Sequence, residues 1–129
     1  EAMRTWELVS LQTMGGTGVT PTATVQLRSL ADDKTYLDAA TGDGPIDAAF
    51  SCITRLTGVE AKLQEFDLRA VTGGKEAQGE ANLELVCNGK TYRGRGRSTD
   101  IIEASVLAFV NAINRAVAGR RKSGASPEK

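Results

Sequence analysis

The sequence predicts an α+β fold made of two βββα units related by a pseudo-twofold axis, in which antiparallel three-stranded sheets pack with helices. Three observations predict it: an internal repeat, strands of alternating hydrophobicity, and an apolar helical stripe at the end of each copy. The tripeptide Lys-Thr-Tyr occurs at residues 34–36 and again at 90–92, an offset of 56. We therefore expect two units, at about 5–58 and 62–119, within one domain over residues 1–119.

Further matches between the copies support the repeat. The same offset places Ile46-Asp47-Ala48 over Ile102-Glu103-Ala104, and Val25 and Leu27 over Ala81 and Leu83. Upstream, "WELVSLQT" from Trp6 matches "FDLRAVTG" from Phe66 at an offset of 60. The loop after the first strand is then four residues longer in the first copy.

The strands are clearest in the second copy. Hydrophobic residues alternate with other residues from Ala81 to Cys87, as in a half-buried antiparallel strand. Asn88-Gly89 follows at once and predicts a two-residue type I′ hairpin. A longer polar segment, "RSLADDKTY", makes the corresponding connection in the first copy, and the glycine-rich segments "GGTGVTP" and "TGGKEAQG" join the first and second strands.

Each copy ends in an amphipathic helix. The first begins at Pro45, whose missing N–H suits the first helical position, and Gly58 predicts its end. The second follows Asp100, which forms a capping-box pattern with Glu103, and we expect it to end near Gly119. Residues 120–129 are predicted to be a disordered polar tail. The apolar stripes are Ile46, Ala49, Phe50, Ile53 and Leu56, and Ile102, Val106, Phe109, Val110 and Ile113.

Composition narrows the function classes. The 129 residues carry 16 basic and 16 acidic side chains and no histidine. Residues from 115 onward hold five basic residues and one acidic residue, which leaves about −4 on the body and argues against nucleic-acid binding. No apolar run is long enough for a membrane span. Cys52 and Cys87 fit buried core thiols, so we expect a cytoplasmic protein.

A glycine turn before each helix is the best candidate for ligand binding. Gly42-Asp43-Gly44 precedes the first helix, and "GRGRST" from Gly94 precedes the second. A helix N-terminus favours a carboxylate, while Asp43 or Asp47 could hold an ammonium group, so such a site suits a free amino acid. Alternatively, the glycines only permit tight turns.

Other chemistries fit less well. "GRGRST" lacks the third glycine of a dinucleotide fingerprint and has Asn114 where an acidic residue is needed. Asp32-Asp33, or Asp43 with Asp47, could bind a hard cation, but a solvated loop and helix N-terminal charges explain them more simply. We therefore expect no cofactor and no metal in this domain. Without histidine or a nucleophile–base pair, we also expect no catalysis by this chain alone.

Three motifs in order carry a family resemblance: "GDGPIDAAF", "AVTGGKEAQGEA" and "GRGRSTDIIEASVLAFVNAINR". From about Trp6 to Ala118 the chain resembles the C-terminal regulatory domain of 2-isopropylmalate synthase. The resemblance implies a homodimer of two βββα units that follows a TIM barrel and a linker in the same chain. It also implies that leucine binds here and inhibits the barrel's condensation of acetyl-CoA with 2-oxoisovalerate, with a divalent metal in the barrel only.

The resemblance also implies an effector site between the two units near the dimer interface. A tyrosine is common in relatives where Phe66 stands, and the related citramalate synthases sense isoleucine with a similar domain. Leucine is our expected effector, isoleucine is the alternative, and a purely structural dimerisation domain is a third possibility. The implied site residues are Gly42, Asp43, Gly44, Asp47, Leu63, Phe66, Ala70, Ala77, Gly79 and Ile101.

Overall fold

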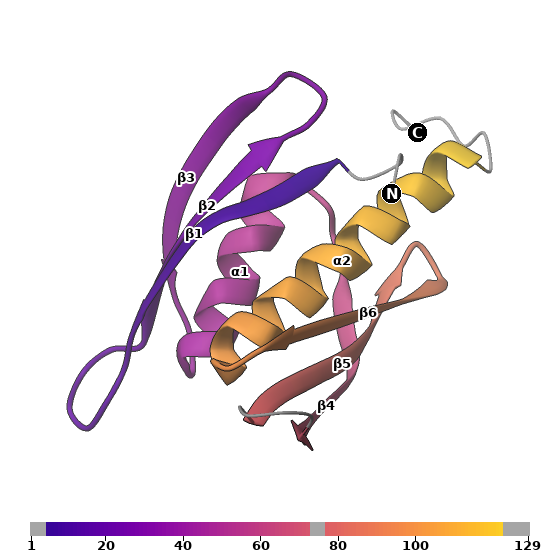
Figure 1. Ribbon diagram of the computed structural model, residues 1–129. Coiled ribbons are helices and arrows are strands. Elements are labelled where there is room, and N and C mark those ends of the chain that lie inside the picture. Colours follow the sequence, from indigo (N-terminus) through magenta and orange to yellow (C-terminus); the bar gives the residue numbers. More distant parts are fainter. Residues whose placement is uncertain (1–4, 73–76, 123–129) are drawn as a thin grey trace.

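The computed structural model describes residues 5–72 and 77–122 and confirms the predicted α+β fold. Each half of the chain forms an antiparallel three-stranded sheet followed by one helix (Figure 1). Sheet A has the strand order β1-β2-β3 and sheet B the order β4-β5-β6. The elements are β1 (Trp6–Met14), β2 (Thr22–Ser29), β3 (Lys34–Thr41), α1 (Pro45–Thr57), β4 (Lys62–Thr72), β5 (Ala77–Cys87), β6 (Lys90–Ser98) and α2 (Ile101–Lys122).

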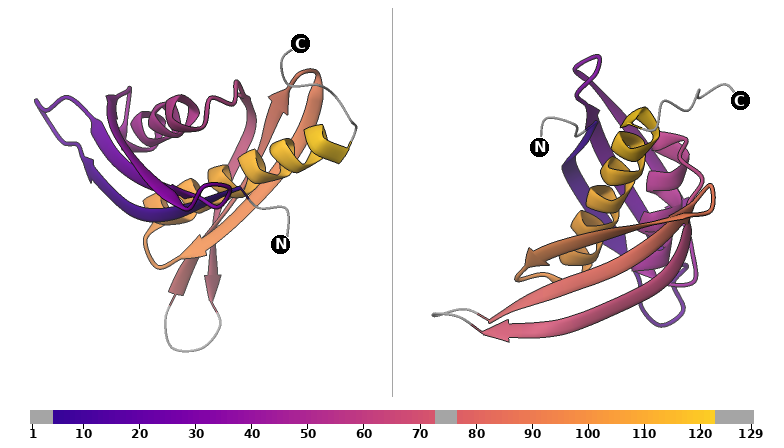
Figure 2. Two further views of the ribbon diagram at one scale, coloured as in Figure 1. Left: turned by 90° about the horizontal axis from the view of Figure 1, so that it is seen from above. Right: turned by 90° about the vertical axis from the view of Figure 1, so that its right-hand side faces the viewer.

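The two helices lie between the two sheets (Figures 1 and 2). Helix α1 packs on β2 and β3, α2 packs on β5 and β6, and the helices contact each other. Leu27 and Ile53 in the first unit, and Leu85 and Ile113 in the second, are fully buried in one shared core. The units therefore bury each other's apolar surface, which neither could do alone.

Cross-strand pairing corrects the alignment of the two copies. Tyr36 pairs with Leu27 and Tyr92 pairs with Leu85, so Leu27 corresponds to Leu85 and not to Leu83. The first strands each have a bulge, after Leu8 and after Leu63, which makes Leu63 the counterpart of Leu8. The offset of 60 between Trp6 and Phe66 is therefore wrong. The offset is 55 at Leu8 and Leu63 and 58 at Leu27 and Leu85, so the segment between the first and second strands is three residues longer in the second copy and not four residues longer in the first. It falls to 56 at the third strands because residues 30–33 join β2 to β3, whereas 88–89 join β5 to β6.

The predicted caps and turns are confirmed, with two corrections. Asn88 and Gly89 have φ of 52° and 78°, as a type I′ turn requires, and Gly58 ends α1 in the left-handed conformation at φ 70°. Asp100 accepts the N–H of Ile102 at 2.9 Å. Glu103 does not close a direct capping box, because it accepts a hydrogen bond from the Ser98 hydroxyl, which itself accepts the N–H of Asp100.

The second correction concerns the end of α2. This helix does not stop at Gly119 but continues to Lys122, so the predicted tail from residue 120 starts too early. Residues 123–129, and residues 73–76 of the glycine-rich segment between β4 and β5, lie outside the described part of the chain. By length and hydropathy alone α2 could cross a membrane, but its apolar side is packed on β5 and β6.

A buried asparagine connects α2 to the start of β1. The Asn114 side chain, which is 4% exposed, accepts the N–H groups of Thr5 and Trp6 at 3.2 and 2.9 Å. It also donates to the Trp6 carbonyl at 2.9 Å. The amide thus satisfies backbone groups at the edge of sheet A, as a neighbouring strand would, and attaches this edge to the helix of the other unit.

Helix α2 lies unusually close to β6. A Cβ atom added at Gly94 would lie 2.0 Å from the Ala108 carbonyl oxygen, and one added at Gly96 would lie 2.3 Å from that of Ala104. Both contacts are with backbone atoms, which cannot move away as a flexible side chain can. These two glycines therefore set the distance between the helix and the sheet.

We predict that Gly94→Ala destabilises the domain by at least about 3 kcal/mol, because the added methyl would push α2 away from sheet B. Urea unfolding followed by circular dichroism measures the change. Gly44→Ala is the matched control: its Cβ would meet no atom within 4 Å, and we expect a cost below about 1 kcal/mol. Equal stability of the two variants would contradict the close packing of α2 on β6.

Candidate functional site

Four of the residues implied by the resemblance line one pocket. Ala70, Ala77, Gly79 and Ile101 surround an open pocket of about 360 Å³. It lies where the β4–β5 hairpin meets the N-terminus of α2. The remaining lining residues are Leu68, Arg69, Gln78 and Thr99. Sequence reasoning missed Arg69 and Gln78, because no spacing or turn motif marks them, whereas Thr99 is the last residue of the "GRGRST" turn.

Gly79 allows α2 to begin close to the sheet. A Cβ atom at this position would lie 2.8 Å from Cγ2 of Ile101. Ile101 is the first residue of α2 and is 51% exposed, so its outer side is available as an apolar wall. The small side chains of Ala70 and Ala77 leave the opposite side of the pocket open.

An uncovered hydrophobic row on β4 continues from this pocket. Leu63 and Phe66 pair with Leu85 and Leu83, whose buried side chains point toward the helices, so the row lies on the same face. Leu63, Phe66 and Leu68 are nevertheless 42%, 37% and 39% exposed. Phe66 is therefore not a core residue but forms a wall at the edge of the core.

The Phe66 ring joins this row to the core. It makes an edge-to-face contact with Phe50 of α1, with ring centroids 6.0 Å apart. Phe50 in turn stacks on Phe109 of α2 at 4.2 Å. The three rings thus run from the open face of β4 to the packing surface between the two helices.

The first glycine turn lies outside the pocket lined by Ala70. Gly42 packs against the first turn of α1, where a Cβ atom would lie 2.6 Å from the Ala48 nitrogen. Asp47 accepts the N–H of Asp43 at 2.9 Å, so its carboxylate closes this turn. Gly44 has φ of −156°, which any residue adopts, and open space around its Cα. Gly42 and Asp47 thus have structural roles, whereas nothing in the fold requires a glycine at 44.

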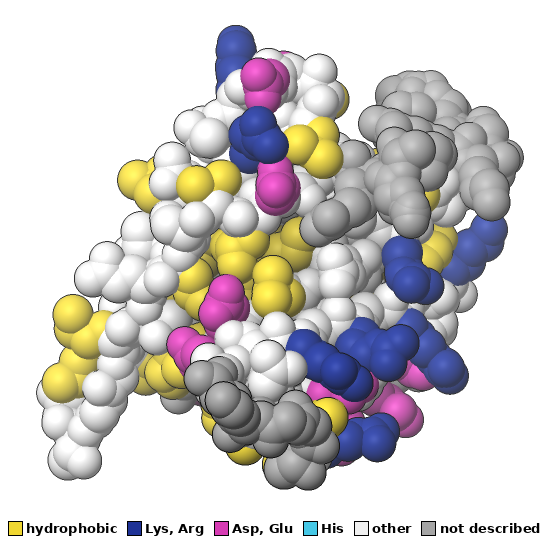
Figure 3. Space-filling view, viewed as in Figure 1, with side chains coloured by type: hydrophobic (Ala, Val, Ile, Leu, Met, Phe, Trp, Pro, Cys, Tyr) yellow, Lys and Arg dark blue, Asp and Glu magenta, His cyan; other side chains and the backbone are white. Residues whose placement is uncertain are grey.

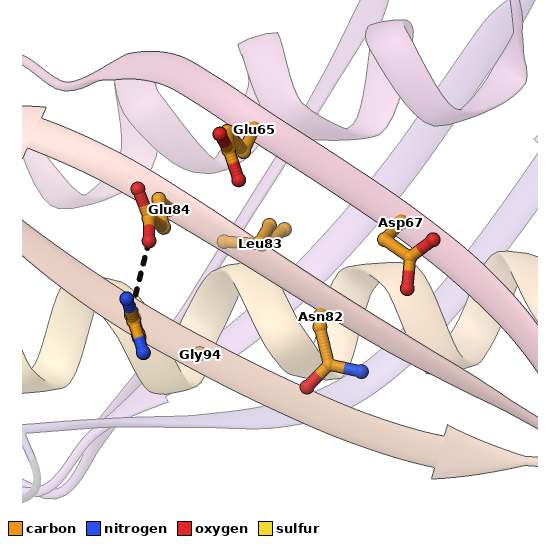
Figure 4. Close-up of a pocket in the computed structure, with 7 residues that line it drawn as sticks. Glu65, Asp67, Asn82, Leu83, Glu84 and Gly94 are labelled. Atoms are coloured by element: carbon orange, nitrogen blue, oxygen red, sulfur yellow. Dashed lines mark hydrogen bonds and ion pairs between the residues drawn. The ribbon is translucent and has the colours of Figure 1, made fainter.

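A second hollow, of about 500 Å³, lies on the outer face of sheet B, which is turned away from the helices (Figure 4). Glu65, Asp67 and Glu84 line it, and the Arg93 guanidinium bonds Glu84 at 2.8 Å. On the same face the pKa of Glu80 is lowered, because Asn82 donates a hydrogen bond to it and Arg97 and Arg95 lie close. These charged walls favour water, so the pocket of small residues is the better candidate for a hydrophobic ligand.

Within the described residues, no three His, Cys, Asp or Glu side chains are placed to hold a metal ion together. Cys52 and Cys87 are both buried and form no disulfide. Burial raises the pKa of the Cys52 thiol, which donates a hydrogen bond to the Asp38 carbonyl. These observations fit the predicted core role of both cysteines.

Residues 1–117 match the family model described as "LeuA allosteric (dimerisation) domain". The chain belongs to this family. It is similar to the 2-isopropylmalate synthases of Sediminispirochaeta smaragdinae, with 46% identity over 110 residues, and of Rhodopirellula baltica, with 47% identity over 114 residues. These matches cover 85% and 88% of the chain but only 21% of each relative. The LeuA domain described here thus spans about a fifth of the length of these enzymes.

We predict that Asp47→Ala lowers the stability of this LeuA domain by about 1 kcal/mol, because the Asp43 N–H loses its acceptor at the start of α1. Asp43→Ala keeps that N–H and the Asp47 carboxylate, and we expect less than half this effect. Urea unfolding of both variants makes the comparison. If Asp43→Ala is the more damaging change, the structural role assigned to Asp47 is wrong.

Proposed function

We propose that this chain is the regulatory domain of a cytoplasmic 2-isopropylmalate synthase and that it binds leucine. Bound leucine would then inhibit the condensation of acetyl-CoA with 2-oxoisovalerate in a TIM barrel of the same polypeptide, which would hold the divalent metal. Family membership and the relatives' names support the enzyme. The observation that carries the ligand is the pocket of small residues between the β4–β5 hairpin and α2.

The pocket has the size and walls that a branched aliphatic side chain needs. Its volume of about 360 Å³ lies at the lower end of small-molecule sites, about 300–1,000 Å³. Leu68 and Ile101 supply apolar contacts, while Ala70, Ala77 and Gly79 leave room. Arg69 also lines the pocket, but its side chain belongs to the outer face of sheet B, where the guanidinium lies 3.9 Å from the Asp67 carboxylate, so we do not assign it to the ligand.

In this proposal Phe66 and Leu63 extend the apolar wall, and the glycine turn contributes to the polar end. The turn lies outside the pocket of the single chain, and the open space at Gly44, where an added Cβ would meet no described atom within 4 Å, leaves it accessible to a ligand. Gly42, Asp43 and Asp47 hold the turn in place beside it.

A second copy of the chain is the proposed cover for the hydrophobic row on β4. Leu63, Phe66 and Leu68 are exposed on an edge strand, and the family description includes dimerisation. Burying this row would remove apolar area from water beside the proposed pocket. Leucine can then act by binding one arrangement of the dimer more tightly than another. The difference between the two binding free energies is the largest shift that leucine can impose on the equilibrium between these arrangements.

Isoleucine is the alternative effector, as in a citramalate synthase. The reason for considering it is Phe66, which stands where many relatives have a tyrosine. A phenylalanine offers no hydroxyl to the ligand, so the wall distinguishes two isomers mainly by shape. Hydrophobic pockets separate ligands that differ in one methylene by only about 1–3 kcal/mol. A purely structural dimerisation domain would bind neither amino acid.

We predict that leucine raises the melting temperature of this chain more than isoleucine or valine does at the same concentration. A ligand at about 100 times its dissociation constant stabilises the native state by about 2.7 kcal/mol, which raises the melting temperature of a domain of this size by about 10 °C. Differential scanning fluorimetry with the three amino acids in parallel measures the shifts, and titration calorimetry confirms binding. A larger shift with isoleucine would favour the alternative effector.

Ala77→Leu tests where the ligand binds. The larger side chain would fill the pocket, so we expect the leucine-dependent shift to disappear while the unliganded melting temperature stays nearly unchanged. Ala31→Leu adds the same atoms at an exposed position outside the pocket and should keep the shift. A shift that survives Ala77→Leu would place the effector elsewhere, and no shift in the original chain would support a purely structural domain.

A further inference from the structure

The outer faces of the two sheets differ in charge at equivalent positions. Side chains on these faces alternate with the buried ones and point away from the helices. Cross-strand pairing defines four equivalent rows, with three positions each. The row nearest the β2–β3 and β5–β6 turns is Glu7-Arg28-Thr35 in sheet A and Lys62-Val86-Thr91 in sheet B, and three further rows follow. In sheet A these three rows are Ser10-Gln26-Leu37, Gln12-Thr24-Ala39 and Met14-Thr22-Thr41. In sheet B they are Glu65-Glu84-Arg93, Asp67-Asn82-Arg95 and Arg69-Glu80-Arg97.

None of the nine positions in these three rows of sheet A is charged, whereas eight of the nine in sheet B are. The ion pairs of sheet B, such as Arg93 with Glu84, have no equivalent in these three rows of sheet A, whose outer face carries an ion pair, Glu7 with Arg28, only in the row beside the β2–β3 turn. Figure 3 shows Lys and Arg gathered over sheet B, while much of sheet A at the left carries uncharged side chains. Because the two sheets share one architecture, the charge of a side chain in sheet A can be compared directly with that of the equivalent side chain in sheet B.

The uncharged part of this face also exposes hydrophobic side chains. Leu37, on the edge strand β3, is 65% exposed, the highest value among the exposed large hydrophobic side chains of the described residues. Met14, at one end, is 55% exposed. Depletion of charge together with exposed aliphatic groups distinguishes the core of a protein interface from ordinary surface. Sheet B, with its charged face, has the ordinary solvated form of an antiparallel sheet.

We propose that the outer face of sheet A is a docking surface for another part of the same polypeptide, the part that the relatives carry beyond this domain. This inference goes beyond the proposed effector site and does not require that leucine binds. The relatives are about five times as long as the matched region, so such a part exists in proteins of this family.

The size of the face favours this occupant over a second copy of the chain. The whole outer face, with the Glu7–Arg28 pair at its rim, consists of three strands of eight or nine residues and covers roughly 15 by 28 Å, or about 400 Å² on each partner. The total of about 800 Å² is below the 1,200–2,000 Å² typical of stable complexes between separate chains. It lies within the range of about 600–1,500 Å² for domains of one chain, where the covalent link raises the effective concentration.

Cysteine accessibility tests the proposal with a matched pair of variants. Leu37→Cys places a thiol on the uncharged part of the outer face of sheet A, and Arg93→Cys places one at the equivalent position of sheet B. Both are made in the full-length polypeptide and in the 129-residue chain, and the maleimide labelling rate of each site is followed by mass spectrometry. Each rate in the full-length protein is divided by the rate in the short chain, which cancels local effects on thiol reactivity. The native Cys52 and Cys87, both buried, remain unlabelled as long as the domain is folded.

We expect labelling of Leu37→Cys to slow by about tenfold or more in the full-length protein, and that of Arg93→Cys to change less than about twofold. Ala39→Cys and Arg95→Cys repeat the comparison in the next row, in case the first variant does not fold. Equal ratios for the two faces would overturn the proposal. Protection already present in the short chain and lost on dilution would also overturn it, because a second copy would then be the occupant.

Discussion

The close approach of α2 to β6 is the constraint on which the rest of the structure depends. Gly94 and Gly96 let the helix backbone lie against the strand, and no other residue fits at either position without displacing it. This places α2 deep enough to pack on sheet B and also to contact α1 and β1. The shared core, the Asn114 bridge to β1 and the pocket under Ile101 all follow from that position.

The local structure could be predicted from the sequence because its signals are local. Pro45 and Gly58 mark the ends of α1, and Asn88-Gly89 marks a hairpin, since each imposes its own backbone geometry. Pairing between strands was harder to predict. The connections between equivalent strands differ in length, and no residue pattern marks which strand residues pair, so the sequence shows the repeat while part of its predicted register is wrong.

The candidate site was predictable only in part, for a similar reason. The family resemblance identified Ala70, Ala77, Gly79 and Ile101, which the fold brings to one pocket. Arg69 carries no motif and is found there only because the β4–β5 hairpin meets the start of α2. The roles of Gly42 and Asp47 in closing the turn depend on contacts with α1 that spacing alone does not reveal.

The differences between the two copies indicate where each copy meets other molecules. In sheet A, α2 and Asn114 hold the edge strand β1, whereas in sheet B the equivalent strand β4 leaves a hydrophobic row exposed. On the outer faces the contrast is reversed, because sheet B is charged over most of its face whereas sheet A carries charge only in the Glu7–Arg28 row. Both the β4 row and the outer face of sheet A expose apolar groups to water, which lowers solubility. A domain that stayed a solvated monomer would have no use for either surface. The proposed dimer contact and the proposed docking surface therefore lie on different units, the first on the helix-facing side of β4 and the second on the side of sheet A turned away from the helices.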